Sequence, residues 1–198
     1  MTPYRRSRSG TVTPLLAALV MLSIAGCTPL QPAEIAVPRQ ALTHFSLEGR
    51  VAAYDDNQSI HGQIAWIHAP RYDRWTLFTP LGQIAAQLEY TPHDVTLTTA
   101  NGQHYQADTL KELPGNLVGI TVPLEHLAHW IQAVPSHQAI VRQLDETGRP
   151  AIIIDQGWRI EYQEYNDNTP AALPRKLEVS QGTTRLRLVI DHWETPSE

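Results

Sequence analysis

Residues 75–88 read WTLFTPLGQIAAQL, and this stretch decides the fold because two alternating runs flank a single turn. Trp75 and Leu77 alternate with polar neighbours, and the run after the turn alternates in the same way, which predicts two strands. Pro80 cannot take the positive φ that a two-residue primed turn needs, which favours a wider loop built on a type I turn. Such a loop pushes Leu81 outward. The leucine could fold back onto the hairpin or meet an apolar partner from outside, and the hairpin alone leaves both open.

The N-terminus has the features of an export signal. Three arginines within the first eight residues precede an apolar run that is too short to span a membrane, followed by a small-residue cleavage site. Residues 1–26 are therefore predicted to be a signal peptide. Residues 24–27 read IAGC and resemble a bacterial lipobox, which makes Cys27 the acylated first residue of the mature protein; the alternative is an ordinary secretory signal with an incidental thiol. Cys27 is the only cysteine, so an internal disulfide cannot form.

The lipid anchor and the charge of the mature chain indicate where the protein works. The several acyl chains of a bacterial lipoprotein anchor it stably. Thr28, rather than Asp, follows the cysteine, which resembles an outer-membrane address, so we expect an outer-membrane protein that faces the periplasm. Removal of residues 1–26 takes away three of 15 basic residues and none of the 20 acidic ones, and the formal charge changes from −5 to −8. This charge disfavours nucleic acid and an electrostatic grip on anionic lipid.

The mature chain divides into a linker and one domain. Prolines among small and polar residues mark 27–40 as the lipidated cysteine followed by an extended tether. The remainder, 41–198, has a length that suits one domain and contains no repeat or second linker. A short helix over 39–44 is expected at the start of this domain.

Short alternating runs separated by turn signals fill most of the domain and predict about ten antiparallel strands. Two helices are expected to interrupt them, one over 109–113 that begins at Asp108 and ends at Pro114-Gly115, and one over 123–135 with an apolar stripe. The predicted fold is mainly β with α (α+β), a curved antiparallel sheet that forms an incomplete half barrel under a helical lid. Its concave face could enclose an apolar cavity or a tightly packed core, and the pattern does not separate the two.

The sequence offers little support for catalysis. His126 and His129 are three residues apart on the second predicted helix and could share a metal ion, but the spacing places no third ligand, and solvated helix histidines are commoner. His61 and His68 are expected to face solvent. There is no Gly-x-Ser-x-Gly nucleophile elbow and no nucleotide-binding signature. We therefore expect no catalytic residue, no metal and no cofactor.

Short pieces spread from Phe45 to Trp193 occur in a consistent order and, together with the lipobox, resemble the LolB family of outer-membrane lipoproteins. The chain differs from the family at its N-terminal end, where the first helix is short and lacks a tryptophan. The pieces are Gly49-Arg50-Val51-Ala52, Trp66, Pro80-Leu81-Gly82, Gly102-Gln103-His104-Tyr105, Val122-Pro123-Leu124 with Leu127 and Trp130-Ile131, Gly157-Trp158-Arg159-Ile160-Glu161-Tyr162, Leu173-Pro174-Arg175-Lys176-Leu177 and Ile190-Asp191-His192-Trp193.

This resemblance implies an open half barrel with a helical lid and an apolar cavity, which accepts lipoproteins from the periplasmic carrier LolA and places them in the outer membrane. Leu81, between Pro80 and Gly82, takes the place of the exposed leucine that the family associates with membrane insertion. The implied partners are a LolA-like carrier, the acyl chains of lipoprotein cargo and the outer membrane, and we expect a monomer.

Combined with the pattern of the residues, the resemblance leads to a site hypothesis. The acyl chains would lie against Trp66, Leu77 and Leu88 on the sheet and Leu127, Trp130 and Ile131 on the lid. The sequence has no nucleotide-binding signature, so the transfer of acyl chains cannot use nucleotide hydrolysis. Each acceptor along the route must therefore bind the acyl chains more tightly than the donor before it. Two alternatives stay open: a lipoprotein that carries free lipid or another hydrophobic molecule, and a structural lipoprotein with a solid core.

Overall fold

A computed structural model describes residues 34–196 except 57 and 114–121, and these residues lie in one compact unit, Pro32–Glu198. The predicted signal peptide, Cys27 and the first part of the tether lie outside the described residues, as does the predicted helix end at Pro114-Gly115. Within the described ranges, the model has no helix whose length and apolar character would let it cross a membrane.

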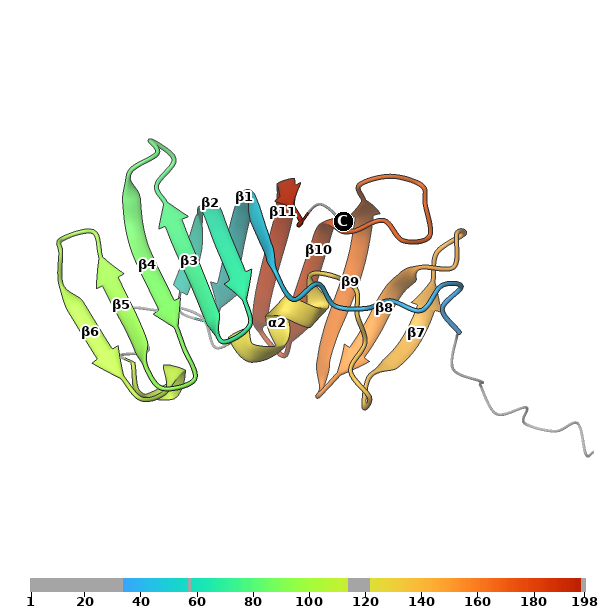
Figure 1. The fold of residues 1–198 in the computed structure, drawn as a ribbon, viewed down its shortest axis with the longest axis horizontal. Coiled ribbons are helices and arrows are strands. Elements are labelled where there is room, and N and C mark those ends of the chain that lie inside the picture. The colour runs from blue at the N-terminus through green and yellow to red at the C-terminus, as the bar shows by residue number, and fades with distance from the viewer. Residues whose placement is uncertain (1–33, 57, 114–121, 197–198) are drawn as a thin grey trace, which may run out of the picture. The chain divides into compact units, whose positions relative to one another are not determined.

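The described part of the chain forms an open, curved sheet of eleven antiparallel strands, which confirms the predicted fold class (Figure 1). The spatial order is β6-β5-β4-β3-β2-β1-β11-β10-β9-β8-β7, so two meanders meet where the first and last strands pair. The strands are β1 (Phe45–Asp55), β2 (Gln58–Ala69), β3 (Tyr72–Phe78), β4 (Ile84–Tyr90), β5 (Val95–Thr99), β6 (His104–Ala107), β7 (Ile140–Leu144), β8 (Pro150–Asp155), β9 (Trp158–Tyr165), β10 (Pro174–Gln181) and β11 (Thr184–Glu194).

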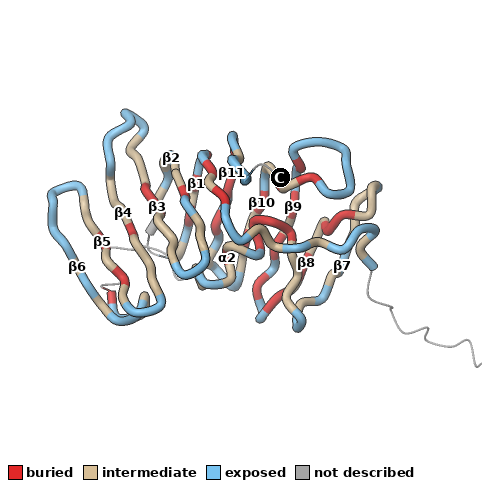
Figure 2. Tube along the Cα trace, viewed as in Figure 1, coloured by how far each residue is buried: buried red, intermediate tan, exposed pale blue. Residues whose placement is uncertain are grey.

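Alternation along the strands separates an apolar concave face from a polar convex face. In β1, every second residue from Phe45 to Ala53 is buried, and the residues between them are partly or fully exposed (Figure 2). Pairing with β2 and β11 carries this alternation across the sheet, because directly paired residues point to the same face. The convex face carries exposed ion pairs such as Arg50–Asp191 and Arg187–Glu178.

The two predicted helices are present but shorter than expected. The first is a single 3₁₀ turn, η1 (Leu110–Glu112), and Thr109 rather than Asp108 stands at its N-cap position, with no side-chain cap hydrogen bond. The second is α2 (Leu124–Trp130), which lies against the concave side of the sheet (Figure 1). It ends before Pro135 because Ala133 takes a positive φ of 55°, which turns the chain out of the helix.

The helix expected over 39–44 is wrong: none of these residues is helical, and 43–44 form a bend. Residues 36–42, which we call the strap, cross the concave side between the β7–β8 turn and the end of α2 (Figure 1). At one end the amide of Ala36 donates to the carbonyl of Gly148 (3.0 Å), and at the other the amide of Leu42 donates to Oε1 of Gln132 (2.7 Å). Because tertiary partners take up these backbone donors, the segment has no need of helical hydrogen bonds. The strap therefore includes the last part of the predicted tether, which is packed on the domain.

Candidate functional site

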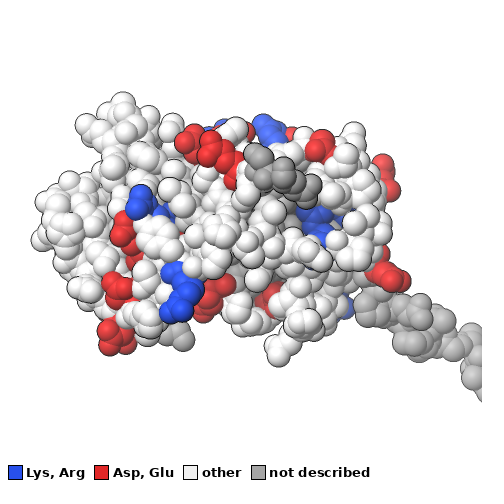
Figure 3. Space-filling model, viewed as in Figure 1, with Lys and Arg blue, Asp and Glu red and all other residues white. Residues whose placement is uncertain are grey.

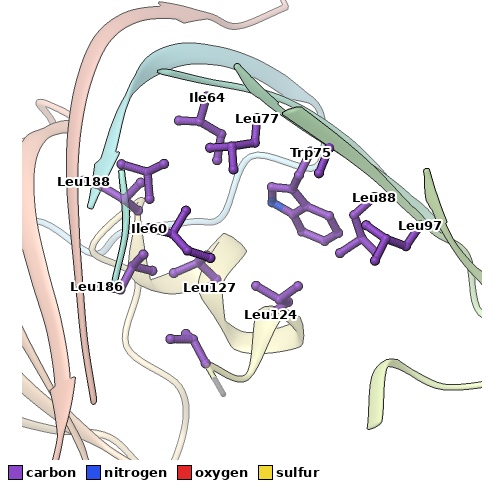
Figure 4. Close-up of a pocket in the computed structure, with 13 residues that line it drawn as sticks. Ile60, Ile64, Trp75, Leu77, Leu88, Leu97, Leu124, Leu127, Leu186 and Leu188 are labelled. Carbon is purple, nitrogen blue, oxygen red and sulfur yellow. The ribbon is translucent and has the colours of Figure 1, made fainter. Parts of the chain in front are cut away.

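An apolar pocket of about 150 Å³ lies between the concave face and the first turns of α2 (Figure 4). Strands β1 to β5 and β11 form its floor and walls, and α2 covers it. Its described lining consists of aliphatic side chains and one tryptophan: Val51, Ile60, Ile64, Trp75, Leu77, Ala86, Leu88, Leu97, Val122, Leu124, Leu127, Leu186 and Leu188.

Strand register brings these side chains together. Leu77 on β3 pairs with Ile64 on β2 and with Ala86 on β4, so the three lie in one row across the sheet. Trp75 and Leu88 pair in the neighbouring row, which extends to Leu97 on β5. Paired residues share a face, so two rows of apolar side chains point at the helix. The floor of the pocket is thus a direct product of the alternation around the β3–β4 turn.

Three of the six residues expected in the cavity are there, namely Leu77, Leu88 and Leu127. The other three do not line it and belong instead to the packed core. Trp66 is covered by the ring of Phe45 at 5.2 Å and by the ring of Trp75 at 5.2 Å, so Trp75 is the tryptophan that faces the pocket. A periodic pattern shows that Trp66 faces inward, but it cannot show that a second aromatic ring lies over it.

Trp130 and Ile131 are fully buried at the other end of α2, on the side of β8 and β9. The indole Nε1 of Trp130 donates to Oδ2 of Asp155 (2.9 Å), and its ring lies 6.0 Å from that of Trp158. The Tyr162 hydroxyl donates to the carbonyl oxygen of Trp130 (2.7 Å), and burial raises the pKa of this tyrosine well above its usual value, so the donor keeps its proton. These contacts fix the C-terminal end of the helix.

Sequence reasoning missed several pocket residues that only the register assembles. Trp75, Ala86 and Leu97 were expected on strands, but nothing along the chain indicates that they share a pocket with Leu186 and Leu188 of the last strand. It also missed the buried carboxylate of Asp155. The available signal was the period of two from Ile153, which places position 155 on the inner face.

The β3–β4 loop presents Leu81 to solvent. The amide of Gly82 donates to the carbonyl of Thr79 (2.8 Å), the amide of Thr79 donates to the carbonyl of Gln83 (2.8 Å), and Gly82 has a φ of +80°. This combination is that of a three-residue loop closed by a left-handed glycine, as the wider-loop prediction requires. Leu81 is 88% exposed, so it does not fold back onto the hairpin.

The loop residues around Leu81 carry no charge, and the hollow that Gly82 borders on the sheet is lined by Glu48, Arg50 and Asp191. Ile84, at the start of β4, is 52% exposed, and the tip of the hairpin shows no charged side chain in Figure 3. Leu81 follows Leu77, which lines the pocket, by four residues on the same hairpin. At about 3.3 Å per extended residue, the Cα atoms of the two leucines are at most about 13 Å apart.

The histidines near the pocket are held by other groups. Nδ1 of His68 lies 2.7 Å from Oδ1 of Asp73, and its ring stacks on Phe45 at 4.7 Å, so the expectation that His68 faces solvent is wrong. His126 stacks on the ring of Trp130 at 5.7 Å. Partial burial lowers the pKa of His129, and the nearby His126 and His68 lower it further. Among the residues that the model describes, no three His, Cys, Asp or Glu side chains are grouped to hold a metal ion.

Comparisons with known proteins agree with this architecture. The family model for outer membrane lipoprotein LolB matches residues 43–193. The chain is 46% identical over 198 residues to the outer-membrane lipoprotein LolB of Azoarcus sp. (strain BH72), with 98% of each chain covered. It is 35% identical over 185 residues to that of Thiobacillus denitrificans (strain ATCC 25259 / T1), covering 91% of this chain and 97% of the relative.

The fold is also similar to that of a solved structure. The LolA superfamily protein NE2245 from Nitrosomonas europaea aligns with a TM-score of 0.50 at 7% identity, covering 81% of this chain and 89% of that one. At this level of identity the similarity concerns the fold alone. It places the curved open sheet among known architectures and carries no statement about ligands.

Proposed function

The chain belongs to the LolB family of outer-membrane lipoproteins, and on that premise we propose that it receives lipoproteins from a LolA-like periplasmic carrier and inserts them into the outer membrane. In this proposal the pocket under α2 holds acyl chains of the cargo, Cys27 carries the lipid anchor and Leu81 docks on the membrane. The observation that carries the proposal is that the β3–β4 hairpin both lines a predominantly apolar pocket and presents a leucine that is 88% exposed at its tip.

Transfer without nucleotide hydrolysis requires each host to bind the acyl chains more tightly than the one before. A tenfold preference corresponds to about 1.4 kcal/mol, which the burial of roughly two more methylene groups supplies. Among the residues that the structure describes, the indole of Trp75 is the only polar side-chain group of the pocket lining, so the affinity of the pocket for an acyl chain comes from apolar burial. A bilayer can bind the acyl chain more tightly than the pocket does, because the bilayer surrounds the acyl chain along its full length.

The pocket must enlarge to receive cargo. Its volume of about 150 Å³ is below the range of about 300–1,000 Å³ that is usual for small-molecule sites. The C-terminal end of α2 is fixed through Trp130, whereas Leu124 and Leu127 near its other end contact the pocket only through apolar packing. We therefore propose that α2 pivots about Trp130 and lifts its N-terminal turns away from the sheet.

Leu81 would bring the pocket close to the membrane. Burial of one leucine contributes about 1.5 to 3 kcal/mol, which is too little to anchor a protein but enough to orient one that is already tethered. Because Leu81 and the pocket residue Leu77 lie on one hairpin, insertion of the loop tip holds that wall of the pocket near the acyl region of the bilayer.

The test is a two-step transfer assay with the mature protein in nanodiscs. A carrier loaded with radiolabelled lipoprotein is added, and the label is followed first onto this protein and then into acceptor liposomes. Leu81→Glu is expected to leave reception unchanged and to reduce release at least tenfold, because a carboxylate at the tip opposes entry into the bilayer. Ile67→Glu serves as the control, since Ile67 is an exposed apolar residue of β2 outside the loop.

Two results would overturn parts of the proposal. Normal release by Leu81→Glu would contradict the docking role of the loop. If no label moves from the carrier onto the unaltered protein, the receptor function itself is wrong, and the pocket serves free lipid or another hydrophobic molecule.

A further inference from the structure

Trp75 is the one residue of the described pocket lining whose side chain carries a nitrogen or oxygen atom. The residue is 8% exposed, and its indole Nε1 is buried without a hydrogen-bond acceptor among the described residues. In Figure 4 the nitrogen edge of the ring is turned toward the side on which Ile60 and Leu127 lie. The nitrogen itself is covered in this conformation, so a ligand would reach it when α2 lifts from the sheet. Within the described parts of the chain, this nitrogen is the only buried side-chain nitrogen or oxygen without a hydrogen-bond partner.

Two of the other buried tryptophans, Trp66 and Trp130, have an acceptor for their indole donor. Nε1 of Trp66 donates to Oδ1 of Asp73 (2.8 Å), and Nε1 of Trp130 donates to Oδ2 of Asp155 (2.9 Å). Neither of these two tryptophans lines the pocket. Buried donors in proteins are nearly always paired, and an unpaired one weakens the fold. The difference suggests that the partner of the Trp75 donor arrives with the ligand.

An ordered water is a poor substitute for that partner. A buried water is retained where two to four polar groups hold it, and the described lining offers only the Trp75 donor. An ionised carboxylate is unsuitable for a related reason. No Lys, Arg or His belongs to the described lining, so the charge would be buried with one hydrogen bond and no counter-ion. A neutral carbonyl oxygen needs only a single donor.

We propose that Nε1 of Trp75 donates a hydrogen bond to the carbonyl oxygen of a long-chain ester or amide. The inference rests on the proposed function and specifies its ligand: the pocket selects acylated lipid over plain hydrocarbon and over free fatty acid. Trp75 is then a specificity-determining residue. The aliphatic side chains of the pocket bind any hydrocarbon chain, whereas the indole favours ligands that carry an uncharged hydrogen-bond acceptor.

The experiment compares three ligands of equal chain length with the mature protein in nanodiscs. They are methyl 12-bromododecanoate, 12-bromododecanoate at pH 8 and 1-bromododecane, and binding is followed by bromine quenching of tryptophan fluorescence. The unaltered protein is expected to bind the ester about fivefold more tightly than the bromoalkane, the effect of one neutral hydrogen bond. The carboxylate is expected to bind more weakly than the ester. Empty nanodiscs give the partition of each ligand into lipid.

Trp75→Phe removes the donor and keeps an aromatic ring. Ester affinity should fall about fivefold to that of the bromoalkane, whose own affinity should stay within about twofold. Trp193→Phe is the matched control, because its Nε1 donates to the Pro174 carbonyl (3.1 Å) and the residue does not line the pocket. This control should keep the preference for the ester.

A second measurement on the unaltered protein does not depend on the stability of the variant. The chain has five tryptophans, so nitrogen-15 labelling gives five indole signals, and Trp75→Phe identifies that of Trp75. The ester should shift the Trp75 indole proton downfield, and the bromoalkane should not. Binding of the ester without this shift, or equal affinity for ester and bromoalkane, would overturn the inference and leave the proposed function standing. Tightest binding of the carboxylate would also overturn it, whereas binding of none of the three would contradict the proposed function.

Discussion

The same seven-residue helix covers a filled region and a hollow region of one concave face. Over β8 and β9, Trp130 and Ile131 at the C-terminal end of α2 are fully buried, and we call this the filled region. Polar contacts hold it, and the hollow that borders it is lined in part by polar side chains such as His129 and Ser136. Over β1 to β5, Leu124 and Leu127 leave the apolar pocket between themselves and the sheet. The contrast shows how one short element can be fixed at one end and free to separate at the other.

Hydrogen bonds between polar groups hold the filled region in place. Asp155 accepts hydrogen bonds from Nε1 of Trp130 and from the Ser136 hydroxyl (both 2.9 Å). The strap adds a second set, because the guanidinium of Arg39 donates to the carbonyls of Gln132 (3.2 Å) and Ala172 (2.7 Å). Directional contacts of this kind specify one arrangement.

The hollow region has apolar contacts and one unpaired donor. Apolar contacts have little directionality, so the helix can move away from the sheet if an acyl chain replaces the lost contacts. Ala86 contributes only a methyl group where its row neighbours carry larger side chains, and this leaves part of the space unfilled.

The largest expected effect comes from removing the anchor of the filled region. Trp130→Ala should lower the free energy of unfolding by about 3–5 kcal/mol, since it empties a fully buried site and leaves Asp155 without one donor. Leu127→Ala, on the same helix but facing the pocket, should cost only about 2 kcal/mol, because one side of Leu127 already borders empty space. Urea unfolding measures both. Equal losses would remove the distinction between the two regions.

A smaller effect is expected from the strap. Arg39→Ala should lower the free energy of unfolding by about 2 kcal/mol, because it removes partly buried charged hydrogen bonds that join the strap to Gln132 and Ala172. Hydrogen exchange should accelerate at Leu42, whose amide is bonded to the Gln132 side chain. Arg74→Ala on the convex face is the control, with an expected loss below about 1 kcal/mol. If Arg39→Ala also lowers the free energy of unfolding by less than about 1 kcal/mol, the contacts of the strap do not stabilise the domain.

The smallest effect on stability tests the hollow region directly. Ala86→Leu should raise the free energy of unfolding by about 0.5–1 kcal/mol, because the added carbons fill part of the pocket, and should weaken binding of a long-chain ester. Ala53→Leu is the counterpart: Ala53 is 1% exposed and does not line the pocket, so the same change should cost about 1–3 kcal/mol through overpacking. Both are measured by thermal unfolding. Destabilisation by Ala86→Leu would contradict the presence of usable space.

Several features of the fold follow from local sequence alone. Alternation predicted the strands and Pro80 predicted the wider loop, whereas the hairpin sequence left open whether Leu81 folds back or stands outward. Such features depend on residues that are neighbours along the chain, where steric limits on φ and the two faces of a strand decide the outcome. The same reasoning failed for residues 39–44, where the expected helix gave way to an extended strap held by distant partners.

The sequence by itself determined that one face of the sheet is apolar and that the turn between β3 and β4 contains a leucine. Only the tertiary structure decided where this face is filled and where it is hollow. Whether Trp66 or Trp75 meets the pocket, and whether Trp130 has a carboxylate partner while Trp75 has none, depends on residues far apart in the chain. Periodicity assigns a side chain to a face, but packing against distant neighbours sets what remains open above it.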